Sequence, residues 1–241
     1  MTHPVDPTDS SAHVEPVIAD GAKGSDGRAK DRPSLAQVAP AWAKDLPQTP
    51  PWQDLSSQVV HQTPWMAVTQ HQAVAPTGKV ADYGVLRFRN VATGVLPIHS
   101  DGTVTLVGQA RFALANYSWE MPEGGAPFDE DPFAAVQREL AEEAGLKARS
   151  WAEALRIEVS NSITDEIGVT WIAWDLSPVP VEPDPTEVIT IVRVPFTALL
   201  AEIERGAIRD SFTVATAYRA YHMAHEGLLP GWLAHAMLTR V

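Results

Sequence analysis

The hydrophobic and polar positions of the chain alternate in short runs over much of its middle, which predicts a protein rich in β-strands. From residue 58 to residue 90, turn residues interrupt β-branched and aromatic runs, and this pattern predicts an antiparallel sheet. Two later runs flank Ser100-Asp101-Gly102, where a hairpin is expected because Asp and Gly accept the positive φ of a tight turn. Further strands are expected at 155–160, 168–175 and 187–194.

Other segments have the spacing of helices. The segment 132–144 carries its own boundaries: Asp131 is a good N-cap, Pro132 suits the first helical position, and Gly145 can adopt the left-handed conformation just past the end. Two more helices are expected, at about 196–205 and 210–224. Strands and helices alternate without a regular β-α-β repeat. The pattern therefore indicates a mixed α/β or α+β sandwich and not a doubly wound nucleotide-binding sheet.

The composition changes along the chain and divides it into four parts. Residues 1–50 are rich in Pro, Asp, Ser, Ala and Lys and show no sustained period, which predicts a flexible, disordered leader. Residues 51–90 are expected to form a small N-terminal antiparallel β-subdomain, and residues 91–225 the principal domain. Residues 226–241 are expected to be a C-terminal tail or a short helix.

The overall composition excludes several classes of protein. Of the 241 residues, 45% are hydrophobic, which is enough for one sizeable core. The net charge of −12 argues against nucleic acid or anionic lipid as a partner. The absence of cysteine removes disulfides, thiolate metal sites and cysteine nucleophiles. Neither a membrane-spanning apolar run nor a signal peptide is present, so a cytoplasmic protein is expected.

The predicted helix at 132–144 holds an unusual group of carboxylates. Glu139, Glu142 and Glu143 cluster on the face adjoining an apolar stripe of Phe133, Val136, Leu140 and Ala144. Like charges at this spacing repel each other and oppose the helix dipole, so helix propensity does not account for them. A hard cation such as Mg²⁺ or Mn²⁺, which prefers oxygen ligands, does account for them. The alternative is an acidic helix face that is simply solvated.

These carboxylates belong to a longer pattern with fixed spacing. Gly124 is followed after five residues by Glu130, after seven more by Arg138-Glu139-Leu140, and then by Glu142-Glu143 and Gly145-Leu146. This pattern resembles the complete signature of the Nudix hydrolases at every fixed position. The resemblance implies an α/β/α sandwich with a mixed sheet. It also implies a loop-helix-loop that binds a divalent metal, Mg²⁺ or Mn²⁺, in an enzyme that hydrolyses a nucleoside diphosphate linked to another moiety.

The resemblance assigns the metal ligands by position in the signature. It makes Glu139 and Glu143 the principal ligands and Glu142 either a further ligand or the general base. The backbone carbonyl of Glu123 is expected to turn toward the metal, since the glycines that follow give the loop backbone freedom.

The remaining signature positions are implied to have structural roles. Arg138 and Glu130 are expected to form an ion pair that orients the carboxylates. Gly124 and Gly145 are expected to allow the chain to enter and leave the helix.

The residues before the signature resemble those of ADP-ribose pyrophosphatases and neighbouring nucleotide-sugar diphosphatases. Those relatives have an arginine on a strand followed by W-E-x-P-x-G-G, matched here by Arg111 and residues 119–125. Trp119 and Glu120 are expected to bind substrate. Arg111 is expected to contact a phosphate or the terminal ribose, the alternative being a surface arginine paired with a carboxylate. The resemblance implies cleavage of ADP-ribose, or a similar nucleoside diphosphate sugar, into nucleoside monophosphate and sugar phosphate.

The loop at 160–168 resembles the Ser-x-x-x-x-Asp-Glu loop that supplies the general base in these relatives. It carries Asp165 and Glu166 between two predicted strands. Glu166 is therefore expected to be the base, on a mobile loop that closes over the substrate, with Glu142 as the alternative. The loop opens with Ser160-Asn161-Ser162 in place of the common Ser-Pro-Gly.

An aromatic residue of the N-terminal subdomain suggests how the protein assembles. Trp65 matches an aromatic of these relatives, in which the subdomain exchanges with a second copy and helps to wall the nucleoside site. The resemblance therefore implies a homodimer, while the alternative for Trp65 is a buried core residue. His222 and His225 have no third ligand at metal-site spacing and are expected on a helix surface. The alternative function is a non-catalytic Nudix-like nucleotide-binding or regulatory module, although no signature carboxylate is missing.

Overall fold

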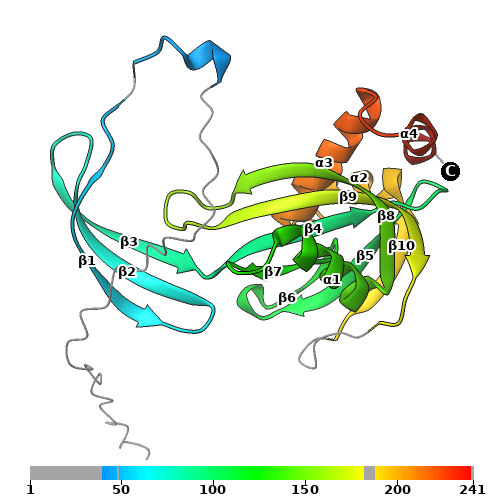
Figure 1. Cartoon of the computed structure of the whole chain (residues 1–241), viewed down its shortest axis with the longest axis horizontal. Coiled ribbons are helices and arrows are strands. Elements are labelled where there is room, and N and C mark those ends of the chain that lie inside the picture. Colours follow the sequence, from blue (N-terminus) through cyan, green and yellow to red (C-terminus); the bar gives the residue numbers. More distant parts are fainter. Residues whose placement is uncertain (1–39, 48, 182–187, 240–241) are drawn as a thin grey trace, which may run out of the picture.

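The computed structural model describes residues 40–47, 49–181 and 188–239. A small sheet stands beside a larger body that contains two further sheets and the helices (Figure 1). The leader expected over residues 1–50 lies almost wholly outside the described residues. Its described end contains a short 3-10 turn, Ala41–Ala43.

The small sheet is antiparallel and comes from the N-terminal part of the chain. Its strands are β1 (Gln53–Gln62), β2 (Met66–Val74) and β3 (Val80–Phe88), in that order. Every residue of β1 is exposed, whereas alternate residues of β2 are buried, which is the pattern of a sheet covered on one face. This is the antiparallel N-terminal sheet that the sequence predicts.

The larger body is built on a mixed four-stranded sheet with the order β7-β4-β9-β8. Strands β4 and β9 run parallel, and the other neighbouring pairs run antiparallel. A three-stranded antiparallel sheet has the order β10-β5-β6. The strands are β4 (Asn90–Pro97), β5 (Thr103–Arg111), β6 (Asn116–Glu120), β7 (Glu123–Pro127), β8 (Leu146–Glu158), β9 (Ile167–Pro178) and β10 (Thr190–Pro195).

Helices cover both faces of the mixed sheet (Figure 1). They are α1 (Pro132–Ala144), α2 (Phe196–Glu204), α3 (Ser211–His225) and α4 (Gly231–Leu238). Strand β9 contributes to two cores, because Val169 and Trp171 pack in the cluster under α1 while Ile172 packs in the cluster under the other helices. The fold is therefore the expected α/β/α sandwich with a mixed sheet.

The helix ends follow from their own residues. Asp131 accepts a hydrogen bond from the Phe133 N–H at 3.1 Å, and Pro132 occupies the first position of α1. The helix ends at Gly145, whose φ of 62° is left-handed. The helices expected at 132–144, about 196–205 and 210–224 are confirmed as α1, α2 and α3.

The hairpin expected at Ser100-Asp101-Gly102 is only partly correct. The turn forms, with Gly102 at a φ of 78° and a hydrogen bond from the His99 N–H to the Thr103 carbonyl. The two strands then separate, because β4 joins the mixed sheet and β5 joins the other sheet. Both strands are buried along most of their length, and each is a central strand with partners on both edges.

The hydrophobic pattern also missed some strand residues. It predicts neither β6 nor β7, since Pro122 and the glycines at 124 and 125 interrupt the alternation there. The strand expected at 155–160 is β8, which begins directly after α1. A register shift between Glu153 and Leu155 breaks its alternation and hides its first half. The strands expected at 168–175 and 187–194 are β9 and β10.

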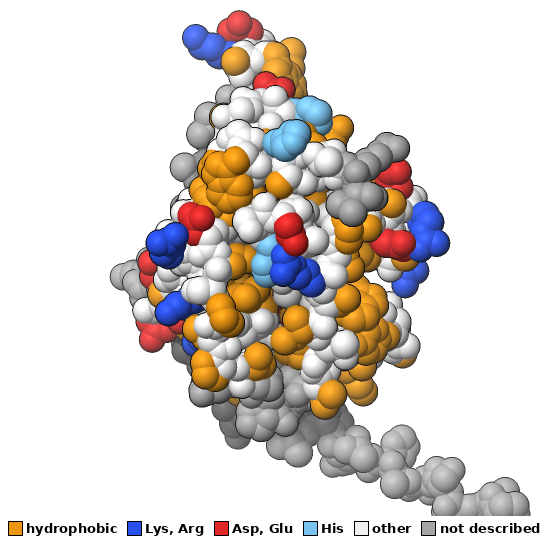
Figure 2. Space-filling model, turned by 90° about the vertical axis from the view of Figure 1, so that its right-hand side faces the viewer, with side chains coloured by type: hydrophobic (Ala, Val, Ile, Leu, Met, Phe, Trp, Pro, Cys, Tyr) orange, Lys and Arg blue, Asp and Glu red, His pale blue; other side chains and the backbone are white. Residues whose placement is uncertain are grey.

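The charged side chains on the visible surface are mixed in sign. On the face shown in Figure 2, acidic and basic side chains lie among apolar ones and do not gather by sign. Within the described residues, no helix has both the length and the apolar character needed to cross a membrane.

Candidate active site

Helix α1 turns its glutamates toward β7 because its apolar stripe is buried against the mixed sheet. Val136 and Leu140 are fully buried in the core that α1 shares with β4 and β9. Phe133 packs edge-on against Trp151, with ring centroids 5.3 Å apart. With the stripe held in this way, the adjoining acidic face of α1 packs along β7.

Two of the α1 carboxylates lie directly against the backbone of β7. Glu143 is only 2% exposed, and its Oε2 accepts a hydrogen bond from the Glu123 N–H at 2.9 Å. Glu139 lies against Gly124, where an added Cβ would come within 2.2 Å of Glu139 Oε1. Gly124 thus forms a cradle that only glycine leaves open for the carboxylate. A set of carboxylate oxygens at such a cradle fits a hard divalent cation.

Arg138 joins the exposed side of the carboxylate group. Its Nη2 lies 3.3 Å from Glu130 Oε2, which is the ion pair that the signature implies. Its Nη1 lies 2.8 Å from Glu139 Oε1 and 3.0 Å from Glu142 Oε2, contacts that the sequence did not predict. Burial lowers the pKa of Arg138, but the Glu130 hydrogen bond and the charge of Glu139 outweigh it and the net shift is upward. A bound cation would share Glu139 and Glu142 with this guanidinium.

A second acidic cluster lies beside the first, around Arg111. The Arg111 Nε lies 3.1 and 3.0 Å from the two carboxylate oxygens of Glu120, and its Nη2 lies 3.0 Å from Glu123 Oε1. Carboxylate oxygens of Glu120, Glu123 and Asp210 all lie within 4.8 Å of one another. Arg111 is therefore paired with carboxylates, as in the alternative stated from the sequence. Its side chain is partly buried, with 35% of its surface exposed.

Asp210 is the member of this cluster that the sequence reasoning missed. It caps α3, and its Oδ2 accepts a hydrogen bond from the Thr213 N–H at 2.7 Å. The Thr213 hydroxyl in turn accepts a hydrogen bond from the Met121 N–H at 2.9 Å, which ties α3 to the link between β6 and β7. The sequence allows Asp210 to be recognised as an N-cap. Its position near Glu120, however, depends on the contact between Thr213 and Met121.

The charges of this cluster disfavour full ionisation. Burial, followed by the charges of Asp210 and Glu120, raises the pKa of Glu123 well above its usual value, and Arg111 offsets this only in part. Burial also raises the pKa of Asp210, against the lowering effect of its hydrogen bonds to Thr213. The Oε2 of Glu123 is buried and has no hydrogen-bond partner in the described part of the chain.

The segment between β8 and β9, residues 159–166, is attached to the N-terminal sheet. The Leu86 N–H donates to the Ile163 carbonyl at 2.9 Å, and the Asp165 N–H donates to the Leu86 carbonyl at 3.3 Å. Glu166 is partly buried, and burial raises its pKa. The loop was expected to be mobile; in this structure it is hydrogen bonded to β3.

The strand register brings this segment to the same end of the mixed sheet as the acidic helix. Ala92 of β4 lies opposite Gly168 of β9 on one side and opposite Gly125 of β7 on the other. Two strand spacings amount to about 10 Å. Glu166, two residues before Gly168, therefore lies at the same end of the sheet as the chain that leads into α1.

The structure also locates the expected aromatic and histidine residues. Trp65 lies between β1 and β2 with 77% of its surface exposed, so its alternative as a buried core residue is wrong. Trp119 of β6 is partly buried and packs edge-on against Tyr117, with ring centroids 5.6 Å apart. His222 and His225 are exposed on α3, as expected.

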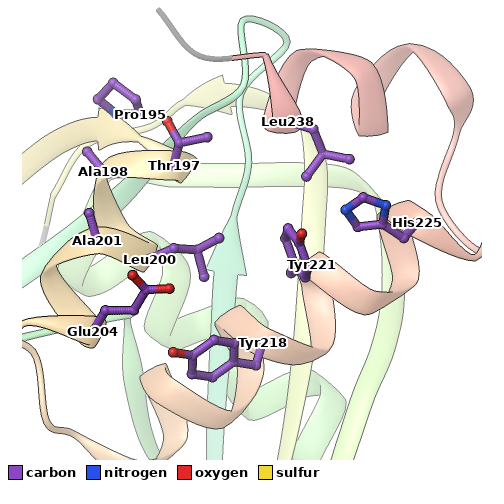
Figure 3. A pocket seen from close by; sticks show the side chains of 10 residues that line it. All are labelled: Pro195, Thr197, Ala198, Leu200, Ala201, Glu204, Tyr218, Tyr221, His225 and Leu238. Atoms are coloured by element: carbon purple, nitrogen blue, oxygen red, sulfur yellow. The ribbon is translucent and has the colours of Figure 1, made fainter.

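A pocket of about 750 Å³ opens between α2, α3 and α4 (Figure 3). Leu200 and Glu204 of α2 face Tyr218 and Tyr221 of α3 across it. Helices α2, α3 and α4 pack in the core on the sheet face opposite α1. The pocket is therefore separate from the carboxylates of α1.

Comparison with known proteins agrees with the fold and with the acidic helix. Residues 88–213, more than half of the chain, match the NUDIX domain, and residues 52–86 match the nucleoside diphosphate sugar hydrolase N-terminal domain. The chain belongs to the Nudix family.

Curated relatives and a solved structure are similar over most of the chain. An ADP-ribose pyrophosphatase of Mycobacterium tuberculosis is 25% identical over 167 residues, which cover 68% of this chain and 80% of that protein. An ADP-sugar pyrophosphatase of Mus musculus is 27% identical over 186 residues, which cover 70% and 85%. A structure described as "Crystal structure of ADP compounds hydrolase" has a TM-score of 0.68 at 19% identity and covers 76% of this chain and 100% of that chain, which supports the fold.

Proposed function

We propose that this enzyme hydrolyses the pyrophosphate bond of ADP-ribose or a similar nucleoside diphosphate sugar, giving nucleoside monophosphate and sugar phosphate. The observation that carries the proposal is the cradle at Gly124, where the carboxylate of Glu139 lies against β7 with Glu143 buried beside it. The substrate class is supported by the relatives named for ADP-ribose and ADP-sugar.

The carboxylates of α1 are proposed to hold Mg²⁺, with Mn²⁺ as the alternative. Glu139 and Glu143 would be the principal ligands, joined by Glu142 and by the backbone carbonyl of Glu123. A bound divalent ion polarises a pyrophosphate and lowers the pKa of the attacking water. Arg138 contributes by holding Glu139 and Glu142 in place from the exposed side.

Glu166 is proposed as the general base that accepts the proton of the attacking water. Its burial raises its pKa, which makes its carboxylate a stronger proton acceptor than an ordinary glutamate. Glu142 is the alternative base, but its Oε2 lies 3.0 Å from the guanidinium of Arg138. Because this ion pair already engages the Glu142 carboxylate, Glu166 is favoured as the base.

Substrate contacts are proposed for Arg111, Glu120, Trp119 and Trp65. Arg111 would bind a phosphate or the terminal ribose, in competition with the carboxylates that hold it in the free protein. Glu120 can position Arg111 or accept hydrogen bonds from ribose hydroxyls. The exposed ring of Trp65 is proposed to wall the nucleoside site. Trp119 of β6 is proposed to contact the substrate from the larger body.

The direct test is hydrolysis by the purified protein of a panel of nucleoside diphosphate derivatives, with Mg²⁺, with Mn²⁺ and with chelator. We expect ADP-ribose or another nucleoside diphosphate sugar to be cleaved in a metal-dependent reaction, with nucleoside monophosphate and sugar phosphate as the products by chromatography. Tight nucleotide binding without any product at any metal concentration would contradict the proposal.

We also propose that the enzyme is a cytoplasmic homodimer that assembles through the N-terminal sheet. Strand β1 supports this, since all ten of its residues are exposed and one of its edges has no strand partner in the described residues. Sedimentation that gave a fully active monomer at micromolar concentration would remove the dimer.

Replacing Gly124 with Ala is expected to lower kcat/KM by about 10²-fold, because the added methyl group pushes the Glu139 carboxylate out of its cradle. Steady-state kinetics at saturating Mg²⁺ measures the effect. Gly84→Ala is the matched control, since a Cβ at Gly84 of β3 meets nothing closer than Gln70 Oε1 at 3.8 Å. Equal activity of the two variants would show that the position of Glu139 does not matter.

A further inference from the structure

Four polar side chains form a connected chain from the N-terminal sheet to the segment that carries Glu166. His71 Nδ1 lies 3.2 Å from both carboxylate oxygens of Asp54. His71 Nε2 lies 3.2 Å from Arg87 Nη2, and Arg87 Nη1 lies 3.2 Å from Asp165 Oδ2. Asp54, His71 and Arg87 come from β1, β2 and β3, while Asp165 immediately precedes Glu166. We refer to these four residues as the Arg87 relay.

The chemistry of the Arg87 relay allows one arrangement of protons. A guanidinium only donates hydrogen bonds, so His71 Nε2 must accept from Arg87 and Nδ1 must carry the proton toward Asp54. His71 is 6% exposed, and the side chains of Arg87 and Asp165 are 18% and 17% exposed. Because the guanidinium is planar, its bond to His71 also sets the direction of the nitrogen that meets Asp165.

Asp165 is held on its backbone as well as on its side chain. Its Oδ1 accepts a hydrogen bond from the Phe88 N–H at 3.0 Å, and its own N–H donates to the Leu86 carbonyl. Thr164 forms a parallel bridge with Leu86, so this part of the segment extends the N-terminal sheet beyond β3. The carbonyl of Glu166 accepts from the Val159 N–H at 3.2 Å, which closes the segment on its other side.

We infer that Arg87 is a positioning residue for the hydrolytic reaction: held by His71 and Asp54, it anchors Asp165 and thereby fixes the backbone from which the Glu166 side chain leaves. This inference rests on the proposed function, in which Glu166 acts on the attacking water. It gives the N-terminal sheet a role within the active site of the same chain, separate from any role in dimer formation. The segment and the sheet act as one unit because the anchor is largely buried.

The test compares Arg87→Met with Arg89→Met in the full-length protein. Arg89 lies two residues away, is exposed, and has no side-chain hydrogen bond or ion pair in the described residues. Arg87→Met should lower kcat by about 10²-fold with little change in KM, since the base is displaced while the substrate contacts stay in place. Arg89→Met should retain the parent kcat. Hydrogen exchange at the Asp165 amide should accelerate in Arg87→Met alone.

Two further variants test the role of Arg87 independently of the folding of Arg87→Met. Asp165→Asn removes the anchor charge at nearly constant volume, and it should reproduce the loss of kcat if Arg87→Met does not fold. In a Glu166→Gln background, Arg87→Met should cause no additional loss, because a positioning residue has nothing left to position. An independent, multiplying loss would overturn the role.

The outcomes also separate this inference from the proposed function. A parent protein that hydrolyses no nucleoside diphosphate derivative would overturn both. An active parent with an unchanged kcat in a folded Arg87→Met variant would overturn only the role of Arg87.

Discussion

Replacing Glu139 with Gln is expected to lower kcat/KM by about 10³-fold, because a metal ion supplies several kcal/mol of transition-state stabilisation and this residue is the proposed central ligand. Glutamine keeps the volume and the helix propensity of glutamate but removes the charge and one ligand oxygen. The amide can still fit the cradle at Gly124, so the fold should survive. Steady-state kinetics over a range of Mg²⁺ concentrations measures the loss.

Thermal unfolding distinguishes this variant from a damaged one. Without metal, the melting temperature should stay unchanged or rise slightly, since the like charges of Glu142 and Glu143 repel Glu139 in the folded helix. The loss of the Arg138 pair partly offsets this gain, and that pair is partly exposed. Stabilisation by added Mg²⁺ should shrink, because metal binding to the folded state produces it.

Glu153→Gln is the control for both measurements. Glu153 lies on β8 and pairs with Arg156 at 2.7 Å, where both side chains are largely exposed. The Glu153→Gln variant should retain the parent activity and the parent response to Mg²⁺. Hydrolysis by Glu139→Gln within a few-fold of the parent would mean that the acidic face of α1 is only solvated surface.

Replacing Glu166 with Gln is expected to lower kcat by about 10²- to 10⁴-fold, the usual contribution of a positioned general base. Substrate affinity and Mg²⁺ binding should change little, because Glu166 is not one of the proposed ligands. The matched comparison is Glu142→Gln, which tests the alternative base on α1. If Glu142→Gln loses the larger share of kcat while Glu166→Gln stays near the parent, the base lies on the helix.

The pH dependence of kcat is a second test of Glu166 as the general base. A base must be deprotonated to act, so the parent kcat should fall as the pH drops through the pKa of Glu166. Burial raises that pKa, and the fall should begin at a higher pH than for an ordinary glutamate. Glu166→Gln should lack this acidic limb. A limb that persists unchanged in the variant belongs to another group.

The sign of the stability effect follows from the same shift. A carboxyl whose pKa is raised in the folded state binds its proton more tightly there than in the unfolded chain. Its contribution to stability is therefore largest at acid pH and decreases as the pH rises through the folded-state pKa. At neutral pH the Gln side chain removes a buried charge, so the melting temperature of Glu166→Gln should be unchanged or higher.

The sequence predicted the elements whose causes are local. The spacing of Glu139, Glu142 and Glu143 follows from the helical period, and the ends of α1 follow from Asp131 and Gly145. Each of these depends on residues within about one turn of each other. The signature as a whole was therefore readable without the tertiary structure, and so was the Nudix fold that it implied.

Strands β6 and β7 could not be predicted from the hydrophobic alternation of their own residues. Strand β7 contains Gly124, Gly125 and Pro127, and Pro122 separates it from β6. Both strands exist because β5 and β4 lie alongside to pair with them. For the same reason β4 and β5 form a turn but not a paired hairpin. Strand partners are chosen by burial on both faces, which neither segment reveals by itself.

By itself, the sequence determined the spacing of the carboxylates on α1, the boundaries of that helix and the family to which the chain belongs. Only the tertiary structure decided that Asp210 joins Glu120 and Glu123 around Arg111, and that Arg87 anchors Asp165 across 78 positions of the chain. The physical reason is the separation along the chain of the residues that interact. Helical period and caps act between neighbours in the chain, whereas these ion pairs exist because separate sheets and helices pack and bury charges that must then find partners.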